Sequence, residues 1–178
     1  MVPNSDNMKL DLFADTDFAG LYSMEECEAP VSVKSRTGLL LNFGDVPIFW
    51  SSKIQTKIAL PTLEAEYIAL SQGMMELVAT RRLVLEMCYK IHFSIKSAST
   101  VSCTWDDNVG TQNLASSKGT LICTRTKYIG VKYHWFRSKI QDGIIEVRRF
   151  GTKAQQVEIL RKGLTILSIE QVRKLVMG

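Results

Sequence analysis

Four carboxylates stand at positions from which an α/β protein could hold divalent cations. Two end predicted strands, one lies at the start of a predicted helix and one in the second turn of a later helix: Asp15, Asp107, Glu66 and Glu158. Ligands of open α/β sheets bind beyond the carboxyl ends of strands, so parallel neighbouring strands would bring the two aspartates together. Such oxygen ligands suit Mg²⁺ or Mn²⁺, and two ions about 3.5–4 Å apart support phosphoryl transfer by activating a water and stabilising the leaving oxygen.

The same residues also have an ordinary structural interpretation. An aspartate at the end of a strand commonly forms a turn, and the partial positive charge of a helix start favours acidic residues there. Spacing alone leaves both interpretations open. The difference between them is whether the carboxylates meet at one edge of a sheet.

The hydrophobic pattern predicts the strands that would carry these residues. Alternating apolar positions predict strands at 8–15, 101–107 and 144–150. A tight turn at Gly44-Asp45 between two apolar runs predicts a hairpin.

A long amphipathic helix is predicted over about 63–90. Thr62 is a good N-cap, Glu64 supplies a charge at the helix start, and so long a helix is expected to bend near Gly73. Shorter helices are predicted at 109–116, at 126–141, and from Thr152 and Ser168 onward. This order of strands and helices indicates an α/β sandwich around a mixed sheet.

Composition is typical of a single globular domain. The chain has 178 residues, of which 46% are hydrophobic and 22% are charged. No apolar run approaches the roughly 18 residues of a membrane span, and the four cysteines form no C-x-x-C pair, which argues against a zinc finger. The net charge of +4 permits a polyanionic partner without requiring one. We interpret residues 1–7 as a linker or as the start of an expressed fragment.

Six segments, in order along the chain, resemble the ribonuclease H domain of copia-type (Pseudoviridae-like) LTR retrotransposon polyproteins. They are Ala14–Gly20, Ser35–Gly38, Pro47–Gln55, Glu64–Ser71, Asp107-Asn108 and the basic stretch Arg125–Arg137. The most specific is E-A-E-Y-I-A-L-S at Glu64–Ser71. The resemblance runs from about residue 8 to the C-terminus and implies one ribonuclease H domain over residues 8–178.

The resemblance implies a ribonuclease H-like fold with a five-stranded mixed sheet flanked by helices. It also implies a metal-dependent endoribonuclease that hydrolyses the RNA strand of RNA/DNA hybrids during reverse transcription. In that chemistry Asp15, Glu66 and Asp107 would be catalytic ligands of two Mg²⁺ or Mn²⁺ ions, with Glu158 as the fourth. Candidates for hybrid binding are Arg36, Lys53, Asn108, Arg125 and Lys127.

The resemblance further implies the surroundings in which such a domain works. Its partners would be the RNA/DNA hybrid and the reverse transcriptase domain of the same polyprotein, with no membrane. We expect a monomer as an isolated domain, located in the cytoplasm within a virus-like particle, or in the nucleus. His134 and Trp135 are expected to pack or cap rather than to take part in chemistry.

One departure from the family pattern bears on activity. Glu158 stands where the family has aspartate. The added methylene moves its carboxylate by about 1.5 Å. A misplacement of about 1 Å can already lower the rate of a catalysed reaction by roughly 100-fold. A weakened or inactive domain that serves as a structural or hybrid-binding part of a reverse transcriptase is therefore the alternative. A third hypothesis, an unrelated sandwich without a nucleic-acid role, requires the order of the motifs to be coincidental. A structure in which Asp15, Glu66 and Asp107 do not converge would support it.

Overall fold

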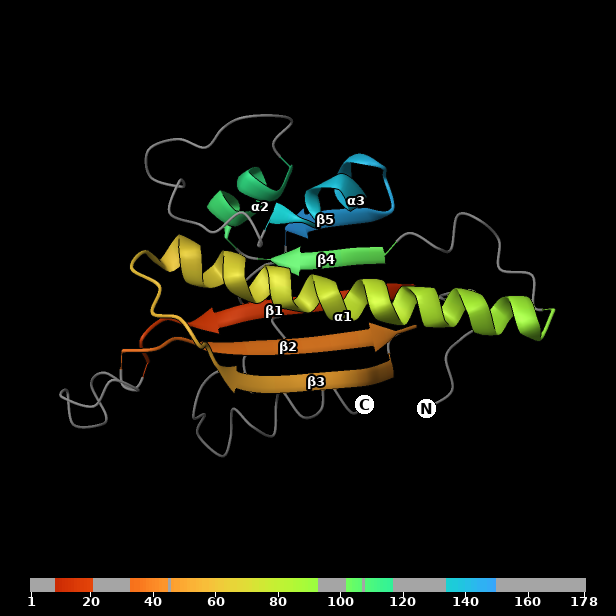
Figure 1. The fold of residues 1–178 in the computed structure, drawn as a ribbon, viewed down its shortest axis with the longest axis horizontal. Coiled ribbons are helices and arrows are strands. Elements are labelled where there is room, and N and C mark those ends of the chain that lie inside the picture. Colours follow the sequence, from red (N-terminus) through yellow and green to blue (C-terminus); the bar gives the residue numbers. More distant parts are fainter. Residues whose placement is uncertain are drawn as a thin grey trace.

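A five-stranded sheet forms the centre of the computed structural model, which describes residues 9–20, 33–44, 46–92, 102–106, 108–116 and 134–149. The strands are β1 (Leu10–Asp17), β2 (Arg36–Phe43), β3 (Val46–Ile54), β4 (Ser102–Asp106) and β5 (Ile145–Arg149). The helices are α1 (Thr62–Lys90), α2 (Val109–Ser116) and α3 (Arg137–Gln141). Figure 1 shows α1 lying across the sheet.

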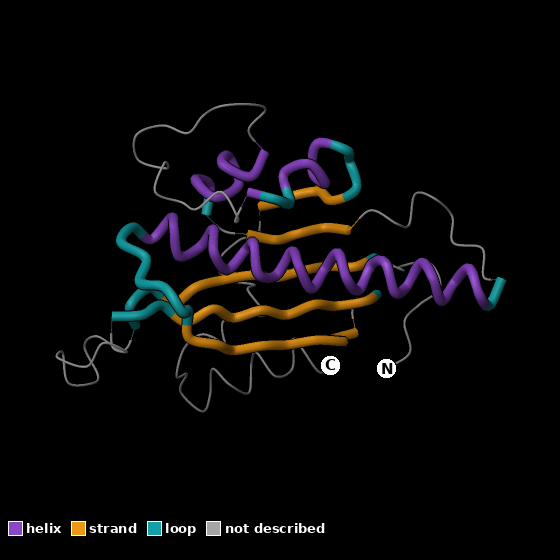
Figure 2. The backbone as a smooth tube through the Cα atoms, viewed as in Figure 1, coloured by secondary structure: helices purple, strands orange, loops and turns teal. Residues whose placement is uncertain are grey.

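The strand order is β3-β2-β1-β4-β5, with β1 at the centre. β1 pairs antiparallel with β2 and parallel with β4, while β2–β3 is antiparallel and β4–β5 is parallel. The predicted α/β fold with a five-stranded mixed sheet is therefore confirmed. Figure 2 shows the strands as one layer, and in Figure 1 the carboxyl ends of β1 and β4 lie at the same edge as the start of α1.

The core lies between α1 and the face of the sheet formed by alternate residues of β1 and β2. Leu12 and Leu41 are paired across these strands and fully buried, and Met74 and Leu77 of α1 pack in the same cluster. A Cβ added at Gly73 would lie 2.9 Å from Leu12 Cδ2, so this glycine lets the helix approach the sheet closely. The helix continues through Gly73 without a break.

The start of α1 differs by one residue from the prediction. Thr62 is the first helical residue rather than the N-cap, and Pro61 occupies the cap position without a side-chain hydrogen bond. The Glu64 carboxylate accepts a hydrogen bond from the Leu60 backbone N–H at 3.3 Å. Because Pro61 has no N–H to offer, Glu64 bonds one residue further back than in a capping box.

The helix predicted at 126–141 is wrong in its described part, where the α-helix begins only at Arg137. His134 and Phe136 both pack on Tyr67, with ring centroids 5.1 Å and 5.5 Å from the tyrosine ring. Side chains two positions apart on an α-helix do not face the same way. His134 instead lies in a 3₁₀ turn, and Phe136, with φ −78° and ψ −10°, occupies the cap position before the α-helix.

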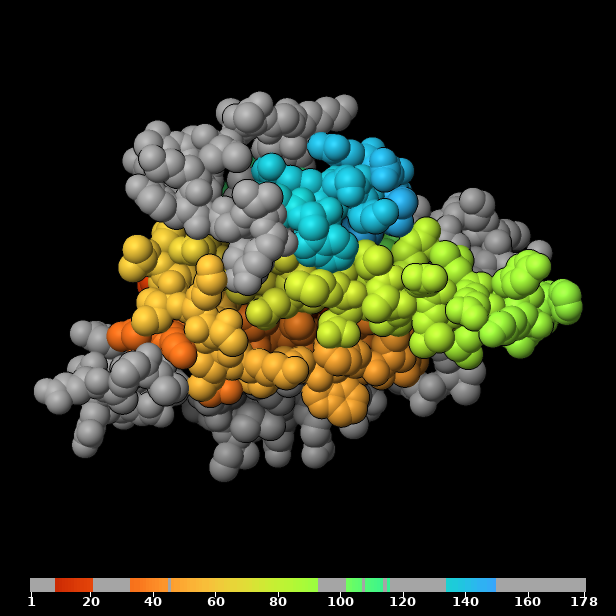
Figure 3. Space-filling model, viewed as in Figure 1, coloured from red at the N-terminus to blue at the C-terminus, as the bar shows by residue number. Residues whose placement is uncertain are grey.

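The second half of α1 lies beyond the buried part of the helix. Leu77 is its last buried residue, and large apolar side chains after it are exposed, including Leu83, Met87 and Tyr89. Figure 3 shows this green end of α1 at the surface. Within the described residues, no helix combines the length and apolar character needed to cross a membrane.

Leu77 and Leu83 offer a matched test of where α1 contributes to stability. Leu77 is completely buried and Leu83 is 57% exposed. Leu77→Ala removes core contacts and leaves a cavity, so it should lower the free energy of unfolding by about 2–5 kcal/mol. Leu83→Ala should change it by less than about 0.5 kcal/mol in urea denaturation, and equal losses at both positions would contradict this packing.

Candidate active site at the carboxyl edge of the sheet

Asp15 lies in the central strand, two residues before its end. β1 extends past the predicted end because Thr16 and Asp17 pair with Thr37 and Arg36 of β2. Asp15 is only 1% exposed, and its Oδ1 atom accepts a hydrogen bond from the Thr16 backbone N–H at 2.7 Å. A buried aspartate inside a strand is not an ordinary turn former, so the structural interpretation weakens at this position.

Glu66 reaches the same edge from α1. The Thr16 hydroxyl donates a hydrogen bond to the Ala65 carbonyl at 3.3 Å. This contact joins the residue after Asp15 to the residue before Glu66, which is itself 8% exposed. Asp15 belongs to the face of β1 away from α1, whereas Glu66 belongs to α1 itself, so the two residues come from opposite sides of the sheet.

The amide of Gln55 holds this junction together. Its Nε2 atom donates to the Ala65 carbonyl at 2.9 Å and to Thr37 Oγ1 at 3.0 Å, and Thr16 Oγ1 lies 3.3 Å from the same nitrogen. These partners come from α1, β2 and β1, and Gln55 is 2% exposed. One buried side chain thus links three elements at the candidate site.

The end of β4 carries a buried carboxylate that the sequence interpretation missed. Asp106 is 1% exposed and lies on the α1 face, as does Thr104, whose hydroxyl donates to Met74 Sδ at 3.6 Å. Asp106 Oδ1 accepts from the Asn108 backbone N–H at 2.7 Å. The alternation of Val101, Cys103 and Trp105 and the family motif both indicated Asp107, which lies outside the described residues. The inward position of Asp106 follows only from the pairing of Thr104 with the core residue Leu12.

Asn108 caps α2. Its Oδ1 atom accepts from the backbone N–H groups of Gly110 at 2.8 Å and Thr111 at 3.2 Å. An asparagine at an N-cap satisfies helix N–H groups that have no intrahelical partner. Capping therefore occupies the side-chain oxygen of Asn108. The contact between Asn108 and substrate stays a prediction.

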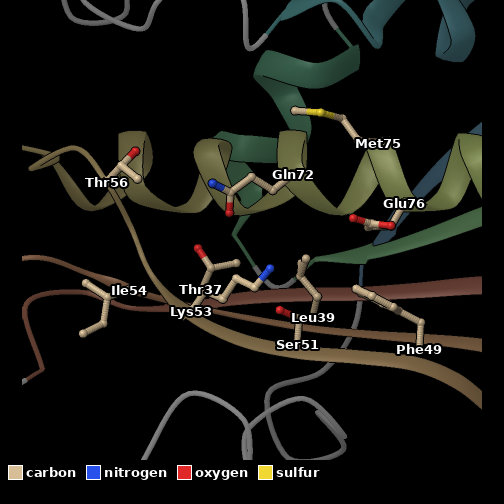
Figure 4. A pocket seen from close by; sticks show the side chains of 10 residues that line it. All are labelled: Thr37, Leu39, Phe49, Ser51, Lys53, Ile54, Thr56, Gln72, Met75 and Glu76. Carbon is tan, nitrogen blue, oxygen red and sulfur yellow. The ribbon is translucent and has the colours of Figure 1, made fainter.

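The two described basic candidates lie on opposite faces of the sheet. Arg36 pairs with Asp17, on the same face as Asp15, and donates to Ser52 Oγ at 3.4 Å. Lys53 pairs with Thr37 on the α1 face. It lines a hollow of about 240 Å³ between β3 and α1, which Figure 4 shows. Arg125, Lys127 and Glu158 lie outside the described residues.

The donor chemistry of this edge fits a hard divalent cation. Asp15, Glu66 and Asp106 are buried, and burying a carboxylate costs several kcal/mol unless its charge is offset. Carboxylate oxygens are the ligands that Mg²⁺ prefers. In the part of the chain that the structure describes, no three His, Cys, Asp or Glu side chains are grouped closely enough to hold a metal, so Asp15, Glu66 and Asp106 do not by themselves form a metal site.

Tyr67, next to Glu66, forms a packed pair with His134. Tyr67 Oη and His134 Nδ1 are 2.9 Å apart. Burial raises the pKa of Tyr67 to about 12, against an opposing effect of Arg137. Burial, and then Arg137, lowers the pKa of His134. Both groups are therefore neutral near neutral pH, and His134 packs as expected, as does the half-buried Trp135 against the core.

Comparisons with known proteins agree with this geometry, although no protein-family model matches the chain. A retrovirus-related Pol polyprotein from transposon TNT 1-94 of Nicotiana tabacum is 33% identical over 148 residues, covering 80% of this chain and 10% of that protein. A Pol polyprotein from transposon RE2 of Arabidopsis thaliana is 26% identical over 163 residues, covering 92% of this chain and 10% of that protein.

Two solved structures share the fold. LC11-RNase H1, isolated from compost, has a TM-score of 0.54 at 12% identity, covering 86% of this chain and 92% of its own. The N-terminal RNase H domain of a Mycobacterium tuberculosis protein has a TM-score of 0.50 at 12% identity, and the match covers 94% of this chain and 97% of that one. This chain is a ribonuclease H-like domain related to copia-type Pol polyproteins. The ribonuclease H-like domain spans about a tenth of the length of the curated relatives it matches.

The lowered pKa of His134 predicts a pH dependence of stability. The unfolded chain protonates this histidine near pH 6.5, whereas the folded ribonuclease H-like domain does so only at lower pH. The unfolded state therefore binds more protons in this window, and the free energy of unfolding falls as pH drops below about 6.5. In His134→Gln the free energy of unfolding should fall less between pH 7 and pH 5 than in the unchanged protein, as measured by urea denaturation at several pH values. An equal fall in both proteins would contradict the assignment.

Proposed function

We propose that this domain is a metal-dependent endoribonuclease that hydrolyses the RNA strand of RNA/DNA hybrids during reverse transcription. The observation that carries the proposal is the junction of Asp15 and Glu66, two buried acidic residues whose neighbours are hydrogen-bonded at 3.3 Å. The motif order and the Pol polyprotein relatives support it.

Two Mg²⁺ or Mn²⁺ ions would be held by Asp15, Glu66, Asp107 and Glu158. When bound, such ions supply an activated water and stabilise the leaving oxygen of the phosphodiester. The contribution of Asp15 and Glu66 is rigid placement, because one belongs to the central strand and the other to the buried first half of α1. Their burial also limits access of bulk water, which strengthens electrostatic interactions at the site.

The substrate would lie across the face of the sheet that carries Asp15 and Arg36. Hybrid recognition would rest on phosphate contacts and on 2′-hydroxyls in a shallow minor groove, with little reading of bases. Of the candidate cations, Arg36 lies on this face, which it shares with Arg148, a residue that ion-pairs with Glu146. Asn108, Arg125 and Lys127 are further candidates. We also propose that the domain works beside the reverse transcriptase of the same polyprotein.

A second candidate function is a weakened or inactive ribonuclease H-like domain that binds hybrid or serves a structural role. The specific observation in its favour is Glu158, whose carboxylate is one methylene further from the backbone than that of aspartate. Because catalysis by positioned ligands is sensitive to distance, this difference alone could lower the rate.

Cleavage of a labelled RNA/DNA hybrid, with Mg²⁺ or Mn²⁺, tests the proposed activity. We expect cutting of the RNA strand only, and Asp15→Asn should lower the rate by at least about 100-fold because it removes a charged ligand. Single-stranded RNA and duplex DNA are the substrate controls. A folded protein that cuts with neither metal would overturn the active-enzyme proposal, and recovery in Glu158→Asp would then identify the added methylene as the cause.

Arg36 and Lys53 give a charge-matched test of where the hybrid lies. Arg36→Gln and Lys53→Gln each remove one positive charge, from opposite faces of the sheet. We expect Arg36→Gln to raise KM several-fold and to reduce the slope of log affinity against log salt by about 1, the value for one lost phosphate contact. Lys53→Gln should leave both KM and the salt dependence of the affinity close to those of the unchanged protein. A larger effect of Lys53→Gln would instead place the hybrid on the α1 face.

A further inference from the structure

Gln55 is a polar residue in a place that packing alone would fill with an apolar one. It follows β3 directly, is 2% exposed, and its backbone N–H donates to the Ser35 carbonyl at 2.8 Å. Its Oε1 atom is buried and has no hydrogen-bond partner among the described residues. A buried carbonyl without a partner destabilises the folded state, so whatever the amide contributes comes through its nitrogen.

The amide nitrogen, in contrast, is fully used. A side-chain NH₂ group has two hydrogens, and the acceptors at 2.9 Å and 3.0 Å are the Ala65 carbonyl and Thr37 Oγ1. Thr16 Oγ1 lies at 3.3 Å and itself donates to Ala65. Gln55, Thr16 and Ala65 therefore form a closed set of contacts in which each touches the other two.

This closed set borders both described acidic residues of the site. Thr16 follows Asp15, and its backbone N–H donates to Asp15 Oδ1 at 2.7 Å. Ala65 precedes Glu66 on α1. A shift of Ala65 relative to Thr16 would carry Glu66 away from Asp15, and Gln55 opposes that shift by bonding both partners.

We infer that Gln55 is a positioning residue that sets the spacing between Asp15 and Glu66, an inference that rests on the proposed metal-dependent function. It acts through the backbone of the two acidic residues without touching substrate. Loss of its amide should therefore lower metal affinity and turnover, and leave hybrid binding largely unchanged.

Gln55→Met tests this, because methionine has a similar length and no donor. We expect Mn²⁺ binding, measured by calorimetry without substrate, to weaken at least about tenfold, as for lost partners that orient metal ligands. We expect kcat for hybrid cleavage to fall by a similar factor, with KM for the hybrid within about twofold. Gln72→Met, the same substitution on α1 in the hollow of Figure 4, is the matched control. Its Mn²⁺ affinity, kcat and KM should equal those of the unchanged protein.

Thr16→Val provides an independent variant if Gln55→Met does not fold. Valine keeps the shape of threonine and removes the hydroxyl that links Gln55 to Ala65. Thr16→Ser keeps that hydroxyl and should lose less metal affinity and turnover than Thr16→Val. Equal losses in the serine and valine variants would overturn the positioning role.

The two proposals fail in different ways. If the unchanged protein binds Mn²⁺ and cleaves the hybrid but Gln55→Met does both equally well, the inference falls and the function stands. If the unchanged protein binds Mn²⁺ without cleaving, and Gln55→Met binds more weakly, the enzyme proposal falls and the positioning role stands. If the unchanged protein neither binds Mn²⁺ nor cleaves, both fall.

Discussion

The hydrogen bond from the Thr16 hydroxyl to the Ala65 carbonyl is the contact on which the arrangement at this edge of the sheet depends. It fixes the first buried turn of α1 against the end of the central strand, where the buried polar side chains of Thr16, Thr37 and Gln55 lie between helix and sheet. Polar groups buried in this way need partners, and hydroxyl and amide side chains supply them here. The apolar core beneath α1 then determines how the rest of the helix lies on the sheet.

Local patterns predicted most of the elements because their signals are local. Gly44, with φ of +54°, occupies the turn predicted between β2 and β3, and α1 ends at Lys90 as its apolar pattern indicated. The beginning of α3 could not be predicted in the same way. The residues just before it pack on Tyr67, which lies about 70 positions earlier, and local patterns do not reveal such a contact.

The candidate site was predictable in its acidic residues and less so in its surroundings. Motif and spacing identified Asp15 and Glu66, but the closed contacts of Gln55 need the tertiary structure. Arg36 and Lys53 looked equivalent in the sequence, and only the strand register separates them by face. Asp106 was missed because the alternation of Val101, Cys103 and Trp105 led to Asp107, whereas the polar residues Thr104 and Asp106 are the ones that lie under α1.

The position of β1 also has a consequence for the order in which the chain can fold. One edge of β1 pairs with the nearby β2, but its other edge pairs with β4, and the Trp105 indole donates to Asp11 across a separation of 94 residues. During synthesis from the N-terminus, the central strand therefore has an open edge until β4 has been made. Open strand edges favour association between chains, so α1 must be translated in full before this hazard is removed.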